Sequence, residues 1–132
     1  MDLTRTGFIL YVNEYDACAA FYREILGLSV LFEQPDLTCF AFGGSYLMVE
    51  RDDEDLQGHH REHPTCLRLN VPDVAARAEA LRQRGVDVDL QVHDWGTVAK
   101  FEDPAGNLCA FKDDATFERQ ILDGQREQHP PR

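Results

Sequence analysis

The chain has 132 residues, enough for one domain with its own core, and such a chain buries roughly two thirds of its unfolded surface. Hydrophobic residues make up 43%, as in globular proteins, and 24 acidic against 13 basic residues give a formal net charge of −11. This charge argues against a nucleic-acid-binding surface, and no apolar run approaches the ~20 residues that span a bilayer.

Apolar runs and their turn residues predict a strand, a helix and three further strands in the first half. The run over 8–12 favours a buried strand, and the polar cluster over 13–16 is typical of a helix start. Helical spacing continues through Phe21 to a stop at Gly27, so we expect Phe21 to pack on the sheet. Strands are predicted over 29–33, 37–42 and 45–50, with Gly43-Gly44 as a tight turn.

The same order returns in the second half, after a charged connector over 51–64 that predicts a surface linker. A strand is expected over 66–71, and a helix over 74–84 with Asp73 as its N-cap and Gly85 as its stop. Further strands are predicted over 86–92, 95–101 and 108–112, the last two joined by the turn 103–107. Residues 125–132 are polar and indicate a frayed tail.

The order β-α-β-β-β therefore occurs twice, with a period near sixty residues: Val12 and Val71 are 59 positions apart. Neither half readily buries both faces of its sheet alone. We expect an α+β fold in which two tandem βαβββ modules form one curled, cup-shaped, mixed eight-stranded sheet with helices on its convex face. The expected organisation is a single domain over 1–132, with modules over 5–50 and 65–113, the linker over 51–64, and a C-terminal helix and tail over 114–132.

Four segments carry recognisable motifs: VNEYDACAAFYREILGL, GGSYLMVE, LRLNVPDVAARAEALRQRGV and FEDPAGNLCAFKD. Their order and spacing across about residues 7–113 resemble the vicinal oxygen chelate superfamily of glyoxalases, bleomycin resistance proteins and ring-cleaving dioxygenases. F-Y-x-x-x-L-G and D-P-x-G-N, one in each module, are jointly quite specific. The resemblance implies paired modules around a cleft. In metal-dependent members, it further implies a divalent ion that is held by two ligands from each module.

The resemblance also locates the family's metal-ligand positions, on the first and last strand of each module. In this chain they read Gly7, Met48, Cys66 and Ala110. Hard divalent cations need carboxylate or imidazole ligands, and one thiol alone makes no stable site. We therefore expect no metal and no other cofactor, with a divalent metal as the alternative. A register shift of two residues would bring Glu50 into play.

Side chains alternate across a strand, so parity predicts which residues face the cleft. The expected ligand-binding residues are Tyr11, Tyr46, Met48, Glu50, Cys66, Arg68, Trp95 and Lys100. This mixed lining suits a small, partly planar ligand with a polar anchor. Arg68 pairs either with a ligand carboxylate or phosphate, or with Glu50, which would close the cleft. Trp95 is either an aromatic lid or a core or edge residue.

Three other features have competing interpretations. His59, His60 and His63 could bind a metal, or belong to a solvated connector, which their charged surroundings favour. His93-Asp94 could be a base with its orienting group, but neighbours in a strand point apart, which favours a turn. Cys66 has no histidine that the sequence places beside it, which favours packing over nucleophilic chemistry.

These observations favour a glyoxalase/bleomycin-resistance-like protein that binds a small aromatic or cationic molecule in a concave cleft without the family metal. The alternative is a metal-dependent or acid–base lyase, isomerase or dioxygenase with Glu50 as a weak catalytic candidate, so enzymatic activity stays open. A third class is an interaction domain whose cleft is closed by Glu50 and Arg68. The four widely spaced cysteines and the missing signal peptide indicate the cytoplasm. We expect a homodimer with no nucleic acid or membrane partner, because open sheet edges benefit from cover.

Overall fold

The computed structural model describes residues 1–52 and 64–128 of the chain. The predicted linker, with His59, His60 and His63, lies outside the described residues except at its ends. The first half comprises β1 (Arg5–Val12), α1 (Tyr15–Ala20), a π-helical turn η1 (Phe21–Ile25), β2 (Val30–Gln34), β3 (Leu37–Phe42) and β4 (Ser45–Arg51). The second half comprises β5 (Thr65–Val71), α2 (Val74–Gln83), β6 (Asp89–His93), β7 (Gly96–Glu102), β8 (Leu108–Asp113) and α3 (Asp114–Gln128).

All eight strands form one mixed sheet in the order β2-β3-β4-β1-β5-β8-β7-β6. β1 pairs in parallel with β4, β5 pairs in parallel with β8, and the antiparallel pair β1–β5 joins the two halves. Each strand of the first half has its equivalent strand of the second half at the same distance from the opposite edge of the sheet. Phe8 of β1 pairs with Leu67 of β5, which lies 59 positions later in the sequence. The predicted α+β fold with two βαβββ units sharing one sheet is therefore confirmed.

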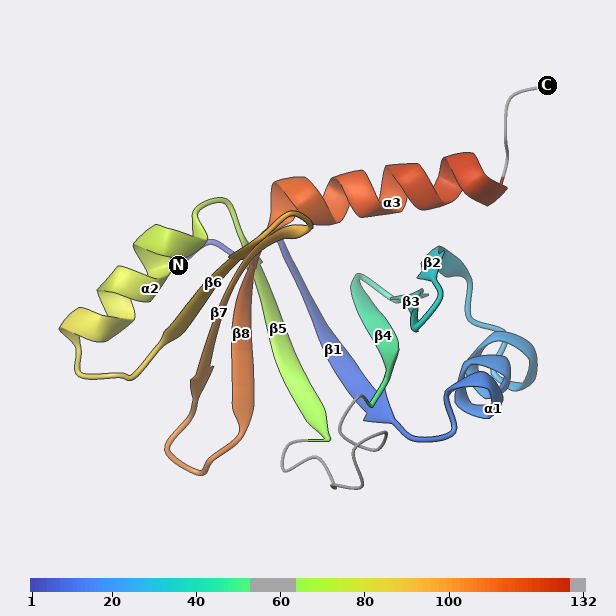
Figure 1. Cartoon of the computed structure of the whole chain (residues 1–132), viewed down its shortest axis with the longest axis horizontal. Coiled ribbons are helices and arrows are strands. Elements are labelled where there is room, and N and C mark those ends of the chain that lie inside the picture. The colour runs from blue at the N-terminus through green and yellow to red at the C-terminus, as the bar shows by residue number, and fades with distance from the viewer. Residues whose placement is uncertain (53–63, 129–132) are drawn as a thin grey trace.

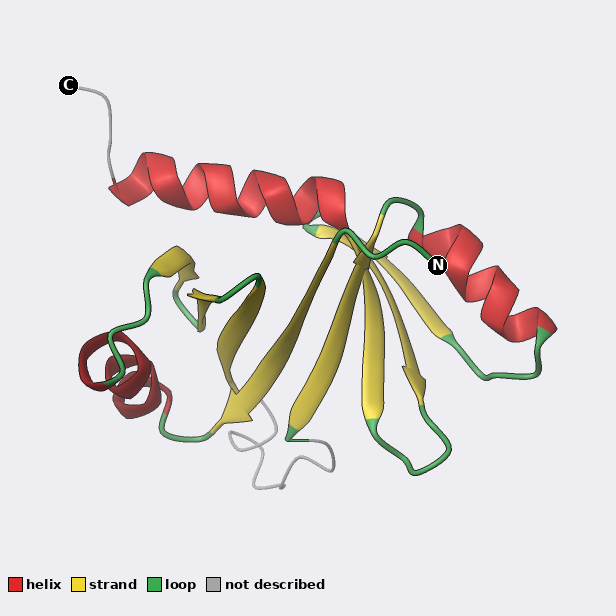
Figure 2. Cartoon of the chain, turned by 180° about the vertical axis from the view of Figure 1, so that it is seen from behind, coloured by secondary structure: helices red, strands yellow, loops and turns green. Residues whose placement is uncertain are grey.

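The sheet has two faces with different covers (Figures 1 and 2). On the outer face, α1 packs over the β2–β4 half through Tyr15 and Ala19, and α2 packs over the β6–β8 half through Val74 and Ala78. On the inner face, α3 places Phe117 and Ile121 in the central apolar cluster. The helices on the convex face are as predicted, and α3 begins where the C-terminal helix was expected, but its position on the opposite face was not predicted.

α3 lies very close to the first module, although it follows the last strand of the second. The ring of Phe117 lies 4.4 Å from that of Tyr46 and 5.8 Å from that of Phe32, measured between centroids. A Cβ added to Gly124 would lie 2.4 Å from the Cβ of Phe32, so only glycine permits this approach of α3 to β2. This contact holds α3, which follows the second module, against β2 of the first module across the inner face.

The predicted helix start and turn in the second half are confirmed by their hydrogen bonds. Asp73 is the N-cap of α2, because its Oδ1 accepts from the Ala76 amide at 3.0 Å. Asp103 Oδ1 accepts from the amides of Ala105 and Asn107, both at 2.9 Å, and closes the turn between β7 and β8. Hydrogen bonds from Asn107 lower the pKa of the Asp103 carboxyl below its ordinary value.

Two expected boundaries are wrong. β6 begins at Asp89 rather than at residue 86, because the Val86 amide donates to the Leu81 carbonyl and Arg82 binds the Val88 carbonyl. Residues 86–88 thus form hydrogen bonds with the last turn of α2 rather than pairing with β7. Residues 125–128 continue α3 instead of belonging to a frayed tail.

The expected packing of Phe21 is also wrong, since this side chain is 46% exposed. The stripe that packs on the sheet is instead the buried Tyr15 and Ala19 with the partly buried Tyr22, at positions i, i+4 and i+7. The Tyr15 hydroxyl anchors it through a 2.6 Å hydrogen bond with Thr38. The π-helical turn, with its Leu26 amide to Phe21 carbonyl bond, then breaks the regular 3.6-residue period on which the prediction relied.

This packing predicts that Tyr15→Ala lowers the free energy of unfolding by about 3–5 kcal/mol, because it empties a buried aromatic site. Phe21→Ala removes an exposed ring and should cost less than about 1 kcal/mol. Urea unfolding followed by circular dichroism measures both values. Equal losses for the two variants would contradict the assigned helix face.

Candidate functional site

A cavity of about 300 Å³ opens at the inner face. It lies between the last two strands of the first module, the β6–β7 turn and α3. Its lining comprises Gln34, Asp36, Leu37, Met48, Glu50, Arg51, Arg68, Trp95 and Gln120. The volume is at the lower end of the range of roughly 300–1,000 Å³ that small-molecule sites occupy. Four of the eight expected cleft residues, Met48, Glu50, Arg68 and Trp95, therefore meet at one cavity.

The strand register explains why these residues meet. Met48 and Glu50 are two apart on β4, so their side chains leave the same face. Ile9 pairs with Met48 on one side and with Cys66 on the other, and Gly7 pairs with Arg68. The inner-face parity expected from the sequence is thus present across β4, β1 and β5.

Arg68 places a positively charged guanidinium on the inner face of the sheet. Its side chain is only 7% exposed, and within the described part of the chain its Nε has no hydrogen-bond partner. No carboxylate of residues 1–52 or 64–128 lies within ion-pair distance of the guanidinium. The structure therefore lacks the expected Glu50–Arg68 pair that would close the cleft. A buried charge without a partner is costly, and an anionic ligand would remove that cost.

Gln120 reaches the same cavity from the middle of α3. Its Oε1 is buried and has no hydrogen-bond partner among the described residues. Only Arg68 Nε and Gln120 Oε1 share this condition in the described part of the chain, and one is a donor and the other an acceptor. Both residues line the cavity, although these two atoms are themselves buried.

Trp95 forms the rim and is held there by Lys112. The indole is 48% exposed and stacks on the His93 ring at 4.5 Å, with 10° between the planes. Lys112 Nζ lies 4.6 Å from the indole centroid, and it donates to the Trp95 carbonyl at 2.9 Å and to Thr116 Oγ1 at 2.8 Å. A Cβ on Gly96 would lie 1.9 Å from Nζ, and the φ of +143° also favours glycine there. Trp95 is thus a half-exposed edge residue that lines the cavity.

Burial lowers the pKa of Lys112 to about 8, against the stabilising charge of Asp113. In the unfolded chain a lysine titrates near pH ~10.4. Between these two values the unfolded state binds more protons, so the contribution of Lys112 to stability rises with pH. Relative to Lys112→Met, the wild type should gain roughly 1–2 kcal/mol of unfolding free energy between pH 7.5 and 9.5. Urea titrations of both proteins at the two pH values measure this, and an unchanged difference would contradict the burial of the charged amine.

Three other expected cleft residues lie on the inner face but not at the cavity. Tyr46 is buried, with its hydroxyl donating to Asn70 Oδ1 at 2.6 Å, and Tyr11 packs against the inner-face cluster. Burial raises the pKa of the Cys66 thiol to about 11, and the nearby Arg68 charge lowers it to a smaller extent. Cys66 therefore stays protonated at neutral pH, as its expected packing role requires.

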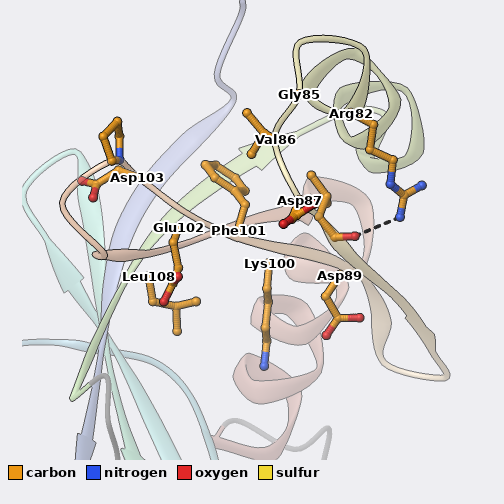
Figure 3. A pocket seen from close by; sticks show the side chains of 12 residues that line it. Arg82, Gly85, Val86, Asp87, Asp89, Lys100, Phe101, Glu102, Asp103 and Leu108 are labelled. Carbon is orange, nitrogen blue, oxygen red and sulfur yellow. Dashed lines mark hydrogen bonds between the residues drawn. The ribbon is translucent and has the colours of Figure 1, made fainter.

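Lys100 lines a different and wider hollow, of about 1180 Å³, between the segment that follows α2 and the β7–β8 hairpin (Figure 3). Figure 3 shows Lys100 beside Asp89, its partner across the β6–β7 pair. The other charged lining residues are Arg82, Asp87, Glu102 and Asp103. Neither of the two unsatisfied buried atoms lies here, so the smaller cavity is the stronger candidate for a ligand site.

The residues at the family's four metal positions do not fit a divalent ion. Gly7 offers no donor, and a Cβ there would lie 2.6 Å from the Tyr46 ring. Met48 and Ala110 offer a thioether and a methyl group, and the Cys66 thiol is protonated. Among the described residues, no three His, Cys, Asp or Glu side chains gather in a way that could hold a metal. The histidine pattern of the connector falls outside those residues.

The His93-Asp94 pair lies at the β6–β7 turn, as expected. His93 ends β6 and its Nε2 contacts Gln91 Oε1 at 2.9 Å, while Asp94 belongs to the turn itself. The structure describes no contact between the two side chains. This pair therefore has no base-and-orienter geometry.

Sequence reasoning missed five of the nine lining residues: Gln34, Asp36, Leu37, Arg51 and Gln120. Leu37 could have been found, because it pairs with Glu50 across the β3–β4 hairpin. Arg51 was assigned to the connector, but it ends β4 and forms a 3.1 Å ion pair with Asp36. Gln120 had no signal, because nothing in the sequence places α3 on the inner face.

Comparison with known proteins places this geometry in a family context. Residues 4–111 match the model of the glyoxalase/bleomycin resistance protein/dioxygenase superfamily. No curated protein matches the sequence. Among solved structures, a superfamily member from Vibrio splendidus 12B01 is 21% identical with a TM-score of 0.61, and covers 83% of this chain and 98% of its own.

Two further structures are similar in fold. One, described as an NAD-dependent benzaldehyde dehydrogenase from Legionella pneumophila, is 18% identical with a TM-score of 0.65, covering 82% of this chain and 97% of its own. The other is the Mn(II)-bound glyoxalase from Novosphingobium aromaticivorans. It is 20% identical with a TM-score of 0.54, and the match covers 86% of this chain and 38% of that one. At these identities the likeness shows the fold alone.

Proposed function

Since this chain belongs to the glyoxalase/bleomycin resistance protein/dioxygenase superfamily, we propose that it binds a small organic acid in the inner-face cavity. The observation that carries the proposal is the buried, unpartnered Arg68. A ligand carboxylate would supply the acceptors that the guanidinium lacks, through a charge-assisted hydrogen bond. In this proposal the residues at the family's metal positions take no part in holding the ligand.

The remaining lining favours an acid with a flat or apolar body. Met48 and Leu37 offer apolar surface, and the half-exposed indole of Trp95 offers an aromatic edge, since His93 and Lys112 lie over its faces. The sequence suggested an aromatic or cationic ligand. The aromatic part of that expectation is kept. The cationic part depended on the net charge of the whole chain, and the charge inside the cavity at Arg68 favours an anion instead.

An acid–base enzyme is the alternative, because Glu50 lines the same cavity as Arg68. A carboxylate there could exchange a proton with a bound acid. Binding is the better supported function, because it needs only the buried guanidinium of Arg68 and no catalytic role for Glu50. Turnover of a bound acid that is lost in Glu50→Gln would favour the enzyme.

Benzoate is a suitable probe, and isothermal titration calorimetry measures its binding. We predict saturable binding by the wild type and at least a tenfold loss of affinity in Arg68→Met, which keeps the volume but removes the charge. Arg51→Met is the matched control, because Arg51 lines the cavity but is already paired with Asp36. Benzylamine, with a similar ring and the opposite charge, should bind more weakly than benzoate. Tighter binding of benzylamine would contradict the proposal.

We also propose a homodimer, as the sequence indicated. Phe8 and Leu67 lie opposite each other on the outer face, between α1 and α2, and are 46% and 38% exposed. A second copy would cover this apolar pair. Sedimentation velocity over a range of concentrations should show a dimer that Phe8→Ser weakens, whereas Val92→Ser, at an exposed residue of β6, leaves it intact. A monomer at all concentrations would contradict the proposal.

A cytoplasmic location is proposed on the state of the cysteines. All four cysteines are free thiols, as in proteins of reducing compartments. In the described residues, no helix is both long and apolar enough to cross a membrane. Fractionation of cells that produce the chain tests the location.

A further inference from the structure

α3 covers the inner face of the curled sheet, although it lies outside the double module. The helix follows β8 and runs across to β2 of the first module, as Figures 1 and 2 show. Phe117 and Ile121 belong to the same apolar cluster as the cavity residue Met48, and Gln120, between them, lines the cavity itself. The position of α3 therefore determines how far the inner-face cavity is open to solvent.

α3 is held by polar contacts at its start and by a narrow apolar stripe along its length. In the first turn, the Thr116 amide donates to Asp113 Oδ2 at 2.9 Å, and Thr116 Oγ1 accepts from Lys112 Nζ at 2.8 Å. Among residues 114–126, the buried positions are Phe117, Ile121 and Gly124. Polar bonds at one end and a stripe with two apolar side chains suit a helix that swings about its first turn.

The closed position of α3 leaves polar atoms without hydrogen bonds. Gln120 Oε1 on the helix and Arg68 Nε on the sheet are buried and have no partner in the part of the chain that the structure describes. A buried polar group without a partner is destabilising, whereas water satisfies it once it is exposed. Movement of α3 away from the sheet would hydrate Gln120 and uncover the part of the inner face that holds Arg68. This hydration lowers the free energy that opening requires.

We propose that α3 is a lid, which opens about its first turn while the two βαβββ modules remain folded and closes over a ligand in the inner-face cavity. The opening is a property of the unliganded chain, whereas the closure rests on the proposed function, in which Arg68 binds an acid. With α3 in place Arg68 is only 7% exposed, so opening gives a ligand a wider path to the guanidinium. Because Gln120 lines the cavity, a bound ligand would contact the closed helix and favour the closed state.

The thiol of Cys39 reports whether α3 is open. Cys39 is fully buried, and it pairs with Phe32 of β2 and with Met48 of β4. The ring of Phe117 lies 5.8 Å from that of Phe32 and 4.4 Å from that of Tyr46, which is two positions from Met48 on the same strand. α3 thus covers the strand positions around Cys39. Alkylation requires a thiolate that the reagent can reach, so the closed helix should protect Cys39.

The experiment measures the rate at which iodoacetamide alkylates Cys39 in the full chain, with peptide mass spectrometry to identify the site. If α3 opens alone, Cys39 should react at least about tenfold faster than the population of globally unfolded chains allows, which urea unfolding gives. Phe117→Ala should raise the rate by about thirtyfold or more, because it removes the larger side chain of the stripe. Val74→Ala, buried under α2 on the outer face, is the matched control. It increases global unfolding but should leave the Cys39 rate within a factor of about two.

Benzoate tests the closure, and its failure is distinct from that of the opening. At about ten times its calorimetric Kd, benzoate should slow the alkylation of Cys39 about tenfold, because a ligand of the closed state depletes the open one. Alkylation at the rate set by global unfolding, with equal acceleration in Val74→Ala, would overturn the lid and leave the acid-binding function intact. Binding of benzoate without any slowing would overturn the closure. If benzoate does not bind, the proposed function and the closure fail together, and the rates of the unliganded protein still decide whether α3 opens.

Discussion

The buried guanidinium of Arg68 is the constraint around which the inner face is organised. It lies on a central strand, next to the β1–β5 seam that joins the two halves of the sheet. Its charge acts on the surrounding groups. Burial raises the pKa of the Cys39 thiol to about 12, and Arg68 is the largest influence in the opposite direction. A chain selected only for stability would place an apolar side chain or a carboxylate partner at this position. In the proposed function, the absence of such a partner among the described residues is the reason why the cavity would favour an anionic ligand.

α3 covers the inner face near Arg68 and encloses the cavity on that side. Without the helix, the inner face would expose the side chains that now pack against Phe117 and Ile121. Lys112 links the helix to the cavity rim, because its ammonium group binds both Thr116 in the first turn of α3 and the carbonyl of Trp95. Gly96 leaves room for the Lys112 side chain, and Gly124 leaves room for the packing of α3 on Phe32. Trp95 at the edge of the cavity and α3 above it are therefore held together by direct contacts.

Much of this arrangement was predictable from local patterns. The repeated β-α-β-β-β order along the chain, the Asp73 cap and the inner-face parity of Met48, Glu50 and Arg68 follow from alternation, capping residues and a repeat of about sixty residues. Such features depend on near neighbours or on the pairing of equivalent strands. The resemblance to the superfamily located its metal positions at residues that carry no suitable donor.

The failures share a physical cause, which is that they depend on long-range packing. Phe21 was assigned to the core by helical spacing, but a π-helical turn and the Tyr15–Thr38 hydrogen bond select another face. Gln120 was not predicted as a site residue because the sequence of α3 does not say which face of the sheet it covers. The Glu50–Arg68 pair was a reasonable alternative on parity alone, and the ion pairs of the described residues do not include it.

The most direct test of this account is the stability of the unliganded Arg68→Met variant, measured by urea unfolding beside the wild type. If Arg68 is kept for a ligand, removal of its unpartnered charge should leave the free energy of unfolding unchanged or raise it by about 1–4 kcal/mol, since apolar replacements of buried charges are often stabilising. A loss of about 3 kcal/mol or more would show that Arg68 holds the fold together through partners of its own. That result would contradict the central claim that the charge is reserved for a ligand.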